Sequence, residues 1–533
     1  MVRDRSAKPG TAVRVRQVPQ EACYFSGLFS YVTTYSVFLH LQTETKMLFN
    51  SIQFAIFLPI VFLLYWFVFD RFISKSEHQL KLQNAFIVVA SYVFYGWWDW
   101  RFLLLIAFTS FCSWGSGLLI GKAESKKNAK TWMWLNIILN LGILALFKYY
   151  DFFVTEFAQL FHISTDGLLL KVILPVGISF YTFQALSYSI DVYRDKIAPT
   201  KDIVAFFAFI SFFPQLVAGP IERATNLLPQ FLKKREFDYD TAVDGMRQIL
   251  WGLFKKIVVA DNCAVYVDQV FSTYTEQTGS TLLLAVIFFT FQIYGDFSGY
   301  SDIAIGTAKL FGIKLMRNFN MPYFSRDIAE FWRRWHISLT TWFRDYVYIP
   351  LGGSRVSKAK VIRNTFVIFL LSGFWHGANW TFIAWGAYHA VLFLPLILTG
   401  KNRKYTNQVA EGRVLPTLKE TGQMLLTFFL AVIGWIIFRA ESIGQAWEYV
   451  CGMCNVSLFS VPLLINRYYY VPKMVFVIIM LVVEWLQREK EHGLDFRGCR
   501  INKTLRWCIY LFFALLTIAL NTQDSTQFIY FQF

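Results

Sequence analysis

The chain has 533 residues, with 51 Lys and Arg against 35 Asp and Glu, which gives a formal net charge of +16. Apolar residues make up 56% and charged residues only 16%, whereas an ordinary soluble domain has about 45–50% and about 25%. These values exclude a soluble multidomain enzyme and a disordered chain. Aromatic residues reach 19%, which suits a protein with much of its surface at or inside a bilayer. We predict a polytopic membrane protein.

The positive charge indicates membrane orientation rather than nucleic acid. Lys and Arg lie in short stretches between apolar segments, such as 122–130 and 488–506, where the positive-inside rule places them. The seven cysteines are scattered, and Cys451 and Cys454 form a lone CxxC without a second pair or a nearby His. We therefore predict no metal site.

Residues 1–46 differ from the rest of the chain. They are basic at first and then only briefly apolar, and Met47 opens an apolar run of about the 20 residues that a spanning helix needs. We predict that 1–46 is a dispensable extension, either genuine or added by a mis-assigned start codon. The membrane domain is predicted to cover 47–533.

Apolar segments recur after Met47 and predict an all-α fold with about 11–12 transmembrane or re-entrant helices. The expected segments are 48–69, 83–96, 100–121, 131–150, 168–187, 203–218, 246–260, 281–297, 364–398 (long enough for two), 421–438, 472–487 and 505–521. Two of them contain breakers, namely Pro175 with Gly177 and the Pro214–Pro220 stretch. Broken helices at membrane depth occur only where protein or a water-filled cavity covers them, so we expect a bundle that contains cavities.

The stretch 296–360 is too charged to span a membrane simply. Trp335, Leu339, Trp342 and Tyr346 follow at i, i+4, i+7 and i+11, which predicts one amphipathic helix at the membrane interface or at a cavity mouth. Its arginines are expected either to extend toward lipid headgroups or to serve a function.

Two of the seven histidines are candidates for chemistry. His336 lies in this expected helix, and His376 lies in an otherwise apolar segment. A buried imidazole in a membrane protein is costly and commonly functional, and histidine is the natural general base near neutral pH. The alternative is a packed residue that hydrogen-bonds a carbonyl. His389 follows His376 by 13 residues, roughly 220° around one straight helix, so we expect a structural role for it.

Asp296 and Asp302 flank Ser298–Gly299, where we expect a helix break. Paired acids there would bind a cation or relay protons, or they would only cap the broken helix. The Gly-Gly turn at 352–353 matches neither a Walker nor a dinucleotide motif, and no GxSxG nucleophile elbow is present.

Four long motifs resemble the membrane-bound O-acyltransferase family: FPQLVAGPIERATNLLPQF, YGDFSGYSDIAIGTAKLFG, NFNMPYFSRDIAEFWRRWHISLTTWFRDYVYIPLGGSR and GFWHGANWTFIAWGAYHA. The resemblance runs from Met47 to Phe533 and is greatest to the alginate O-acetyltransferase branch, with the D-alanine exporters of teichoic acid as more distant relatives. It implies a helical funnel or tunnel with short amphipathic interfacial helices. On this sequence the family's membrane-buried essential histidine maps to His376, and its second, upstream position maps to His336.

The resemblance further implies acetyl-CoA as a donor substrate reached from the cytoplasm, with no bound cofactor. We expect a multi-pass protein of the inner membrane that O-acetylates an exported, alginate-like polysaccharide. A D-alanine-type acyl exporter and, from another class, a glycan flippase are the alternatives. We see no soluble domain that could hold a sugar chain. We therefore expect a periplasmic or membrane-anchored partner resembling an SGNH serine esterase, and no nucleic acid.

The segment Phe528–Phe533 reads FIYFQF and has four aromatic residues in six. Burial of one such ring contributes roughly 1.5–3 kcal/mol, so we expect this segment to fold back against the bundle. It resembles a short aromatic motif of a small companion protein in the D-alanine branch. The alternative is an interfacial anchor without catalytic consequence.

Overall fold

We describe a computed structural model of the chain, for residues 47–69, 78–217, 219–463, 467–521 and 528–529. The predicted extension 1–46 lies outside the described residues, so its dispensability stays a prediction. No strand occurs in the described ranges. The α-helices are α2 (Ile52–Leu63), α4 (Gln79–Asp99), α5 (Arg101–Lys122), α6 (Lys126–Leu144), α7 (Tyr150–Leu160), α8 (Ile178–Tyr193), α9 (Ile203–Ser211), α10 (Phe213–Leu216), α11 (Ala224–Phe231), α12 (Tyr239–Leu253), α13 (Asp261–Ser272), α14 (Gly279–Leu310), α15 (Ile328–Arg334), α16 (Ile337–Phe343), α17 (Lys358–His376), α18 (Trp380–Leu398), α19 (Leu418–Arg439), α20 (Ile443–Met453), α21 (Arg467–Leu486) and α22 (Lys503–Ala519).

Five of the described helices are long and apolar enough to cross a bilayer. They are Arg101–Lys122, Lys126–Leu160, Gly279–Leu310, Trp380–Leu398 and Leu418–Arg439. The prediction of an all-α, multi-pass membrane protein is confirmed. Two further expected segments lie in α4 and α21, which have 21 and 20 residues, whereas the segments with breakers form the shorter α8, α9 and α10.

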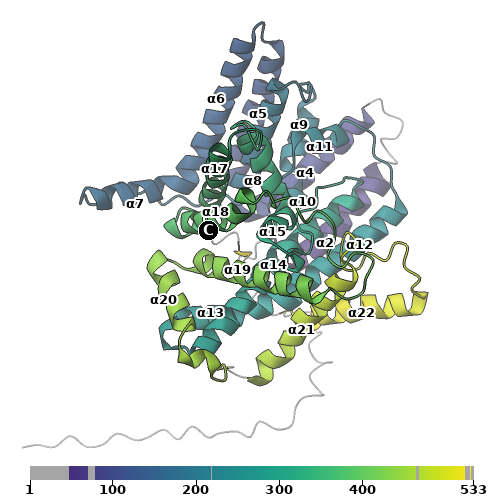
Figure 1. Cartoon of the computed structure of the whole chain (residues 1–533). Coiled ribbons are helices and arrows are strands. Elements are labelled where there is room, and N and C mark those ends of the chain that lie inside the picture. The colour runs from purple at the N-terminus through teal and green to yellow at the C-terminus, as the bar shows by residue number, and fades with distance from the viewer. Residues whose placement is uncertain (1–46, 70–77, 218, 464–466, 522–527, 530–533) are drawn as a thin grey trace, which may run out of the picture. The chain divides into compact units, whose positions relative to one another are not determined.

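Helix α14 runs among the other helices and packs against α12, α13, α19 and α20 (Figure 1). Its contact with α12 depends on glycine. Gly252 and Gly245 of α12 face Gly299 and Gly306 of α14, and a Cβ on Gly299 would lie 2.7 Å from the Gly252 carbonyl oxygen. The two backbones therefore touch, which fixes α14 tightly against its neighbour.

The expected break at Ser298–Gly299 is wrong, because α14 is continuous from Gly279 to Leu310. Gly299 serves the close approach of α12 instead of a turn. The expected single helix through His336 is also wrong. α15 ends at Arg334 and α16 begins at Ile337, while Trp335, Leu339, Trp342 and Tyr346 are all buried. These aromatic residues form core rather than an interfacial stripe.

Helices α17 and α18 form a hairpin and lie side by side (Figure 1). Gly386 of α18 and Gly373 of α17 permit their close approach, since a Cβ on Gly386 would lie 2.3 Å from the Phe369 carbonyl oxygen. The apolar segment 364–398 is thus two helices, and the turn between them follows His376 directly. His376 and His389 accordingly do not share one straight helix.

Candidate active site

His336 lies at the break between α15 and α16. Its backbone is left-handed, with φ 43° and ψ 54°, a conformation that is rare for a residue with a side chain and that persists only when its surroundings hold it. Backbone hydrogen bonds from Ile337 N to the Asn318 carbonyl (2.8 Å) and from Asn320 N to the Arg334 carbonyl (2.9 Å) fix both sides of the break. The left-handed backbone at His336 thus interrupts the helix, and the imidazole is buried inside the protein.

A buried amide fixes the His336 ring. Its Nδ1 lies 2.9 Å from Oδ1 of Asn318, which also accepts from Ser338 Oγ at 2.9 Å. The amide nitrogen of Asn318 donates to Ser301 Oγ at 3.1 Å, so the oxygen faces the imidazole. An oxygen can only accept, and Nδ1 of His336 therefore carries the proton in the neutral ring while Nε2 carries the lone pair.

His376 is the last residue of α17, and its ring is almost fully buried. Trp385 and Phe438 pack edge-on against it, with centroid distances of 5.2 and 5.4 Å. The His336 and His376 ring centroids are 6.4 Å apart. Residues separated by 40 positions in the chain thus lie together in the fold.

His389 lies on α18 and shares a packing partner, Trp385, with His376. Trp385 packs against both His376 and His389, the latter with centroids 5.0 Å apart. Trp332 packs edge-on against His389 at 4.9 Å. His389 is thus a neighbour that supports the wall of the site.

Two cavities lie near the histidines, and His376 lines one of them while Asn318, the partner of His336, lines the other. Asn318 lines one of about 20 Å³ together with charged residues of α14 and α21 and with the loop that follows α21. His376 lines the other, of about 70 Å³, together with Lys148 and the segment Leu174–Phe180. The cavity beside His376 is the larger of the two, whereas the polar cavity beside Asn318 has room for about one water.

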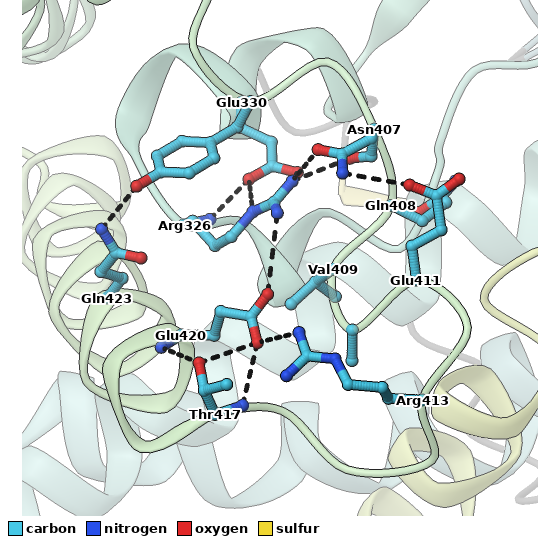
Figure 2. A network of polar contacts seen from close by, with 12 residues as sticks. Arg326, Glu330, Asn407, Gln408, Val409, Glu411, Arg413, Thr417, Glu420 and Gln423 are labelled. Atoms are coloured by element: carbon cyan, nitrogen blue, oxygen red, sulfur yellow. Dashed lines mark hydrogen bonds and ion pairs between the residues drawn. The ribbon is translucent and has the colours of Figure 1, made fainter.

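An ion network supports the helix that leads into His336 (Figure 2). Glu330 of α15 accepts from Arg326 Nη2 at 3.0 Å and from Arg334 Nη2 at 2.7 Å, and all three side chains are buried. Arg326 also donates to the Asn407 carbonyl, and its Nη1 lies 3.9 Å from Oε1 of Glu420 at the start of α19. Of the two alternatives for the arginines, Arg334 does not extend toward headgroups, because it is buried and binds Glu330 of α15 and Gln408 of the loop before α19.

The two α14 carboxylates are paired with lysines. Asp302 lies 2.6 Å from Lys255 Nζ. Asp296 lies 2.7 Å from Nζ of the fully buried Lys256, which also binds Asp261 at 2.8 Å. Because lysine ammoniums occupy these positions, the arrangement argues against a cation site, and the capping role expected at a helix break is wrong as well.

The segment after α22 reaches this region. Ile529 N donates to Oδ2 of Asp296 at 2.7 Å, and Phe528 and Ile529 are buried. The Phe528 ring packs against Tyr300 at 4.5 Å and against Phe297 at 5.9 Å, and Phe297 packs edge-on against His336 at 4.6 Å. Docking is thus observed for Phe528 and Ile529, whereas 530–533 lie outside the described residues.

One further cluster has the composition of a metal site. Asp244, His492 and Asp495 offer ligand atoms within 4.8 Å of one another. Lys309 binds Asp244 at 2.6 Å and Arg497 binds Asp495 at 2.6 Å, so the carboxylates already have cations. Burial opposes ionisation of Asp495, but hydrogen bonds from Arg497 outweigh it and lower its pKa to about 2. We assign this cluster to structure.

Sequence reasoning missed Asn318 and Lys148 as site residues. Lys148 had a signal, because it is an isolated lysine in an expected membrane segment. No sequence pattern marked Asn318 beyond its place in a long motif, because its hydrogen bonds to Ser301 and Ser338 form only when α14 and α16 pack together.

In its described ranges the chain is a helical, multi-pass membrane protein with two neighbouring buried imidazoles, one of which lines a cavity. A model of the membrane-bound O-acyltransferase family matches residues 195–419, a range that holds both histidines. The probable alginate O-acetylase AlgI of Pseudomonas aeruginosa is 42% identical over 408 residues, covering 75% of this chain and 74% of that protein. The chain belongs to the membrane-bound O-acyltransferase family and is an acyl-transferring enzyme.

Two further relatives differ in what their names describe. A peptidoglycan O-acetyltransferase of Helicobacter pylori is 33% identical and covers 91% of this chain and 98% of its own length. A teichoic acid D-alanyltransferase of Bacillus subtilis is 30% identical and covers 50% of this chain and 69% of its own length.

Proposed function

We propose that this enzyme takes acetyl groups from acetyl-CoA on the cytoplasmic side of the inner membrane and delivers them for O-acetylation of an exported, alginate-like polysaccharide. The observation that carries the proposal is the buried pair His376 and His336, with His376 lining a cavity of about 70 Å³. Support for acetyl and for alginate comes from relatives named as alginate O-acetylases at about 40% identity.

In the proposed reaction His376 is the general base and His336 its partner. The hydroxyl oxygen of the acceptor bonds to the acyl carbon while His376 takes the hydroxyl proton. The carbon–sulfur bond of the thioester then breaks, and the proton passes from the imidazolium to the leaving thiolate. His336, fixed by Asn318, orients the reacting groups through its Nε2 side.

The first test replaces the two histidines. His376→Ala and His336→Ala should express and insert normally, while acetyl transfer falls by about 10²–10⁴-fold, the usual contribution of a positioned acid or base. Acetate bound to the polymer is measured in cells, and transfer of labelled acetyl in membranes. His389→Gln is the matched control, because it is equally buried and packs on the same Trp385. A folded His376→Ala enzyme with wild-type transfer contradicts the mechanism.

A second acceptor, peptidoglycan, is favoured by one observation. The relative named for peptidoglycan matches this chain nearly from end to end, whereas the alginate relative matches three quarters. Mass analysis of isolated muropeptides and of secreted polysaccharide, with and without the gene, separates the two acceptors. A D-alanine cargo has weaker support, since that relative covers half of this chain.

We propose further that a periplasmic or membrane-anchored protein resembling an SGNH serine esterase completes the transfer onto the polymer. In the described residues the chain is helical and compact around the site, and long soluble segments are absent from the sequence. The partner should co-purify with this enzyme, and its deletion should abolish polymer acetylation. Full acetylation without any partner contradicts this proposal.

A further inference from the structure

Lys148 is a lysine at membrane depth beside the candidate base. It lies in the span Lys126–Leu160, on a π-helical turn (Ala145–Tyr149), a distortion that is frequent at functional sites. Its Nζ donates to the carbonyl oxygens of Trp375 at 2.8 Å and of His376 at 2.9 Å. It also lies 5.8 Å from the Trp375 ring centroid.

These partners do not neutralise the ammonium. Within the described parts of the chain, Lys148 meets carbonyls and a ring face, not a carboxylate. In the described ranges the two lysines with almost fully buried side chains, Lys255 and Lys256, each have an aspartate within 2.7 Å, whereas the half-buried Lys148 has none. A charge left without a counter-ion at membrane depth is costly and marks a functional position.

One donor of the ammonium remains for a ligand. An ammonium carries three N–H groups, and the two carbonyls of the α17 terminus take two. Lys148 and His376 line the same cavity of about 70 Å³, which is several times the space that one water requires. A two-carbon acyl group in this cavity would contact the ammonium on one side and the imidazole on the other.

We propose that Lys148 is a catalytic residue whose third N–H binds the carbonyl oxygen of the acyl group. This inference rests on the proposed acetyl transfer. As the acceptor oxygen bonds to the acyl carbon, the carbonyl electron pair moves onto oxygen, and the ammonium stabilises that negative charge. When the carbon–sulfur bond breaks, the carbonyl re-forms and Lys148 still holds its proton. This is the role of an oxyanion hole donor.

The variant Lys148→Met keeps the apolar stem and removes the charge. We expect kcat to fall about 10²–10³-fold, as for loss of one oxyanion donor, with the KM for acetyl-CoA nearly unchanged. Lys148→Arg keeps the charge and should retain more activity than Lys148→Met. Lys130→Met, an exposed position on α6, is the matched control and should equal the wild type. Thermal unfolding in detergent shows whether each variant folds. If Lys148→Met does not fold, Lys148→Gln takes its place.

A comparison of donors separates charge stabilisation from a structural cap on α17. Fluorine on the acyl group stabilises the developing oxyanion itself, so Lys148→Met should lose less activity with fluoroacetyl-CoA than with acetyl-CoA. A misplaced His376 would lower both rates by the same factor. Equal factors for the two donors, or wild-type activity in Lys148→Met, overturn the inference. A wild-type enzyme that transfers neither group contradicts the proposed function itself.

Discussion

Asn318 determines which nitrogen of His336 carries the proton. Its Oδ1 accepts from the imidazole and from Ser338, and its amide donates to Ser301, so the three bonds leave no alternative orientation for the ring. A second group that fixes the tautomer of a catalytic histidine is commonly worth a large part of the rate.

We expect Asn318→Leu to lower kcat by about 10–100-fold while the KM for the acyl donor changes little. Leucine has a similar volume but cannot accept a hydrogen bond from Nδ1. Ser338→Ala removes one bond to the same amide and should have a clearly smaller effect. Steady-state kinetics in membrane vesicles measure both, and equal kcat values for wild type and Asn318→Leu contradict the assigned tautomer.

At the scale of elements, α15 is positioned by charge. Glu330 lies between two buried arginines, as Figure 2 shows for Arg326. Glu330→Gln leaves both guanidiniums without their counter-ion, and breaking a buried pair in this way costs about 3–5 kcal/mol. We expect a lower thermal midpoint and reduced activity, because α15 leads into His336. Glu411→Gln, on the exposed loop of the same network, should leave the midpoint unchanged.

The contact of α12 with α14 is sensitive to the volume of the side chain at position 299. We expect Gly299→Ala to destabilise the enzyme by about 1–3 kcal/mol, because its Cβ would meet the Gly252 carbonyl and force the helices apart. Gly422→Ala in α19 is the control, since open space surrounds that glycine and helix propensity favours alanine by roughly 0.5–1 kcal/mol. Thermal unfolding in detergent should therefore shift in opposite directions for the two variants.

The helices follow from the sequence, and so do the breaks at Gly177 and at Pro214, but the break at His336 does not. The apolar segments predict membrane helices correctly because bilayer thickness fixes their length. The aromatic period from Trp335 to Tyr346 continues through His336, so the pattern does not reveal the left-handed residue between α15 and α16. Gly299 was expected to break a helix, yet glycine serves equally for close packing, and only the position of α12 distinguishes the two.

The candidate site was predictable in its histidines and not in their surroundings. His336 and His376 were expected from the cost of burying an imidazole and from the family resemblance, and the fold brings them together. Asn318 and Lys148 act across the sequence, through contacts with residues 18 and more than 220 positions away. The spacing of residues in a single sequence does not indicate which distant positions come into contact in the fold.

At the scale of the whole molecule, the segment at 528–529 connects to the site through α14. Phe528 packs on Phe297, which packs on His336. We expect Phe528→Ala and deletion of 528–533 to lower acyl transfer at least tenfold in folded protein, since loss of a buried ring costs about 3–5 kcal/mol locally and frees the wall of the site. Phe512→Ala, exposed on α22, is the control. Unchanged transfer after deletion would show that the segment is only an anchor.

The hydrogen bond between Ile529 and Asp296 can form only late in the synthesis of the chain. Ile529 follows Asp296 by 233 residues, so α14 is made and inserted long before its carboxylate can meet this donor. At about 5–20 residues per second, the ribosome takes on the order of ten to fifty seconds to reach it. During that interval Phe528 cannot cover Phe297, which packs on His336. We therefore expect a protein truncated before residue 528 to insert into the membrane and to lack this last contact to the wall of the site.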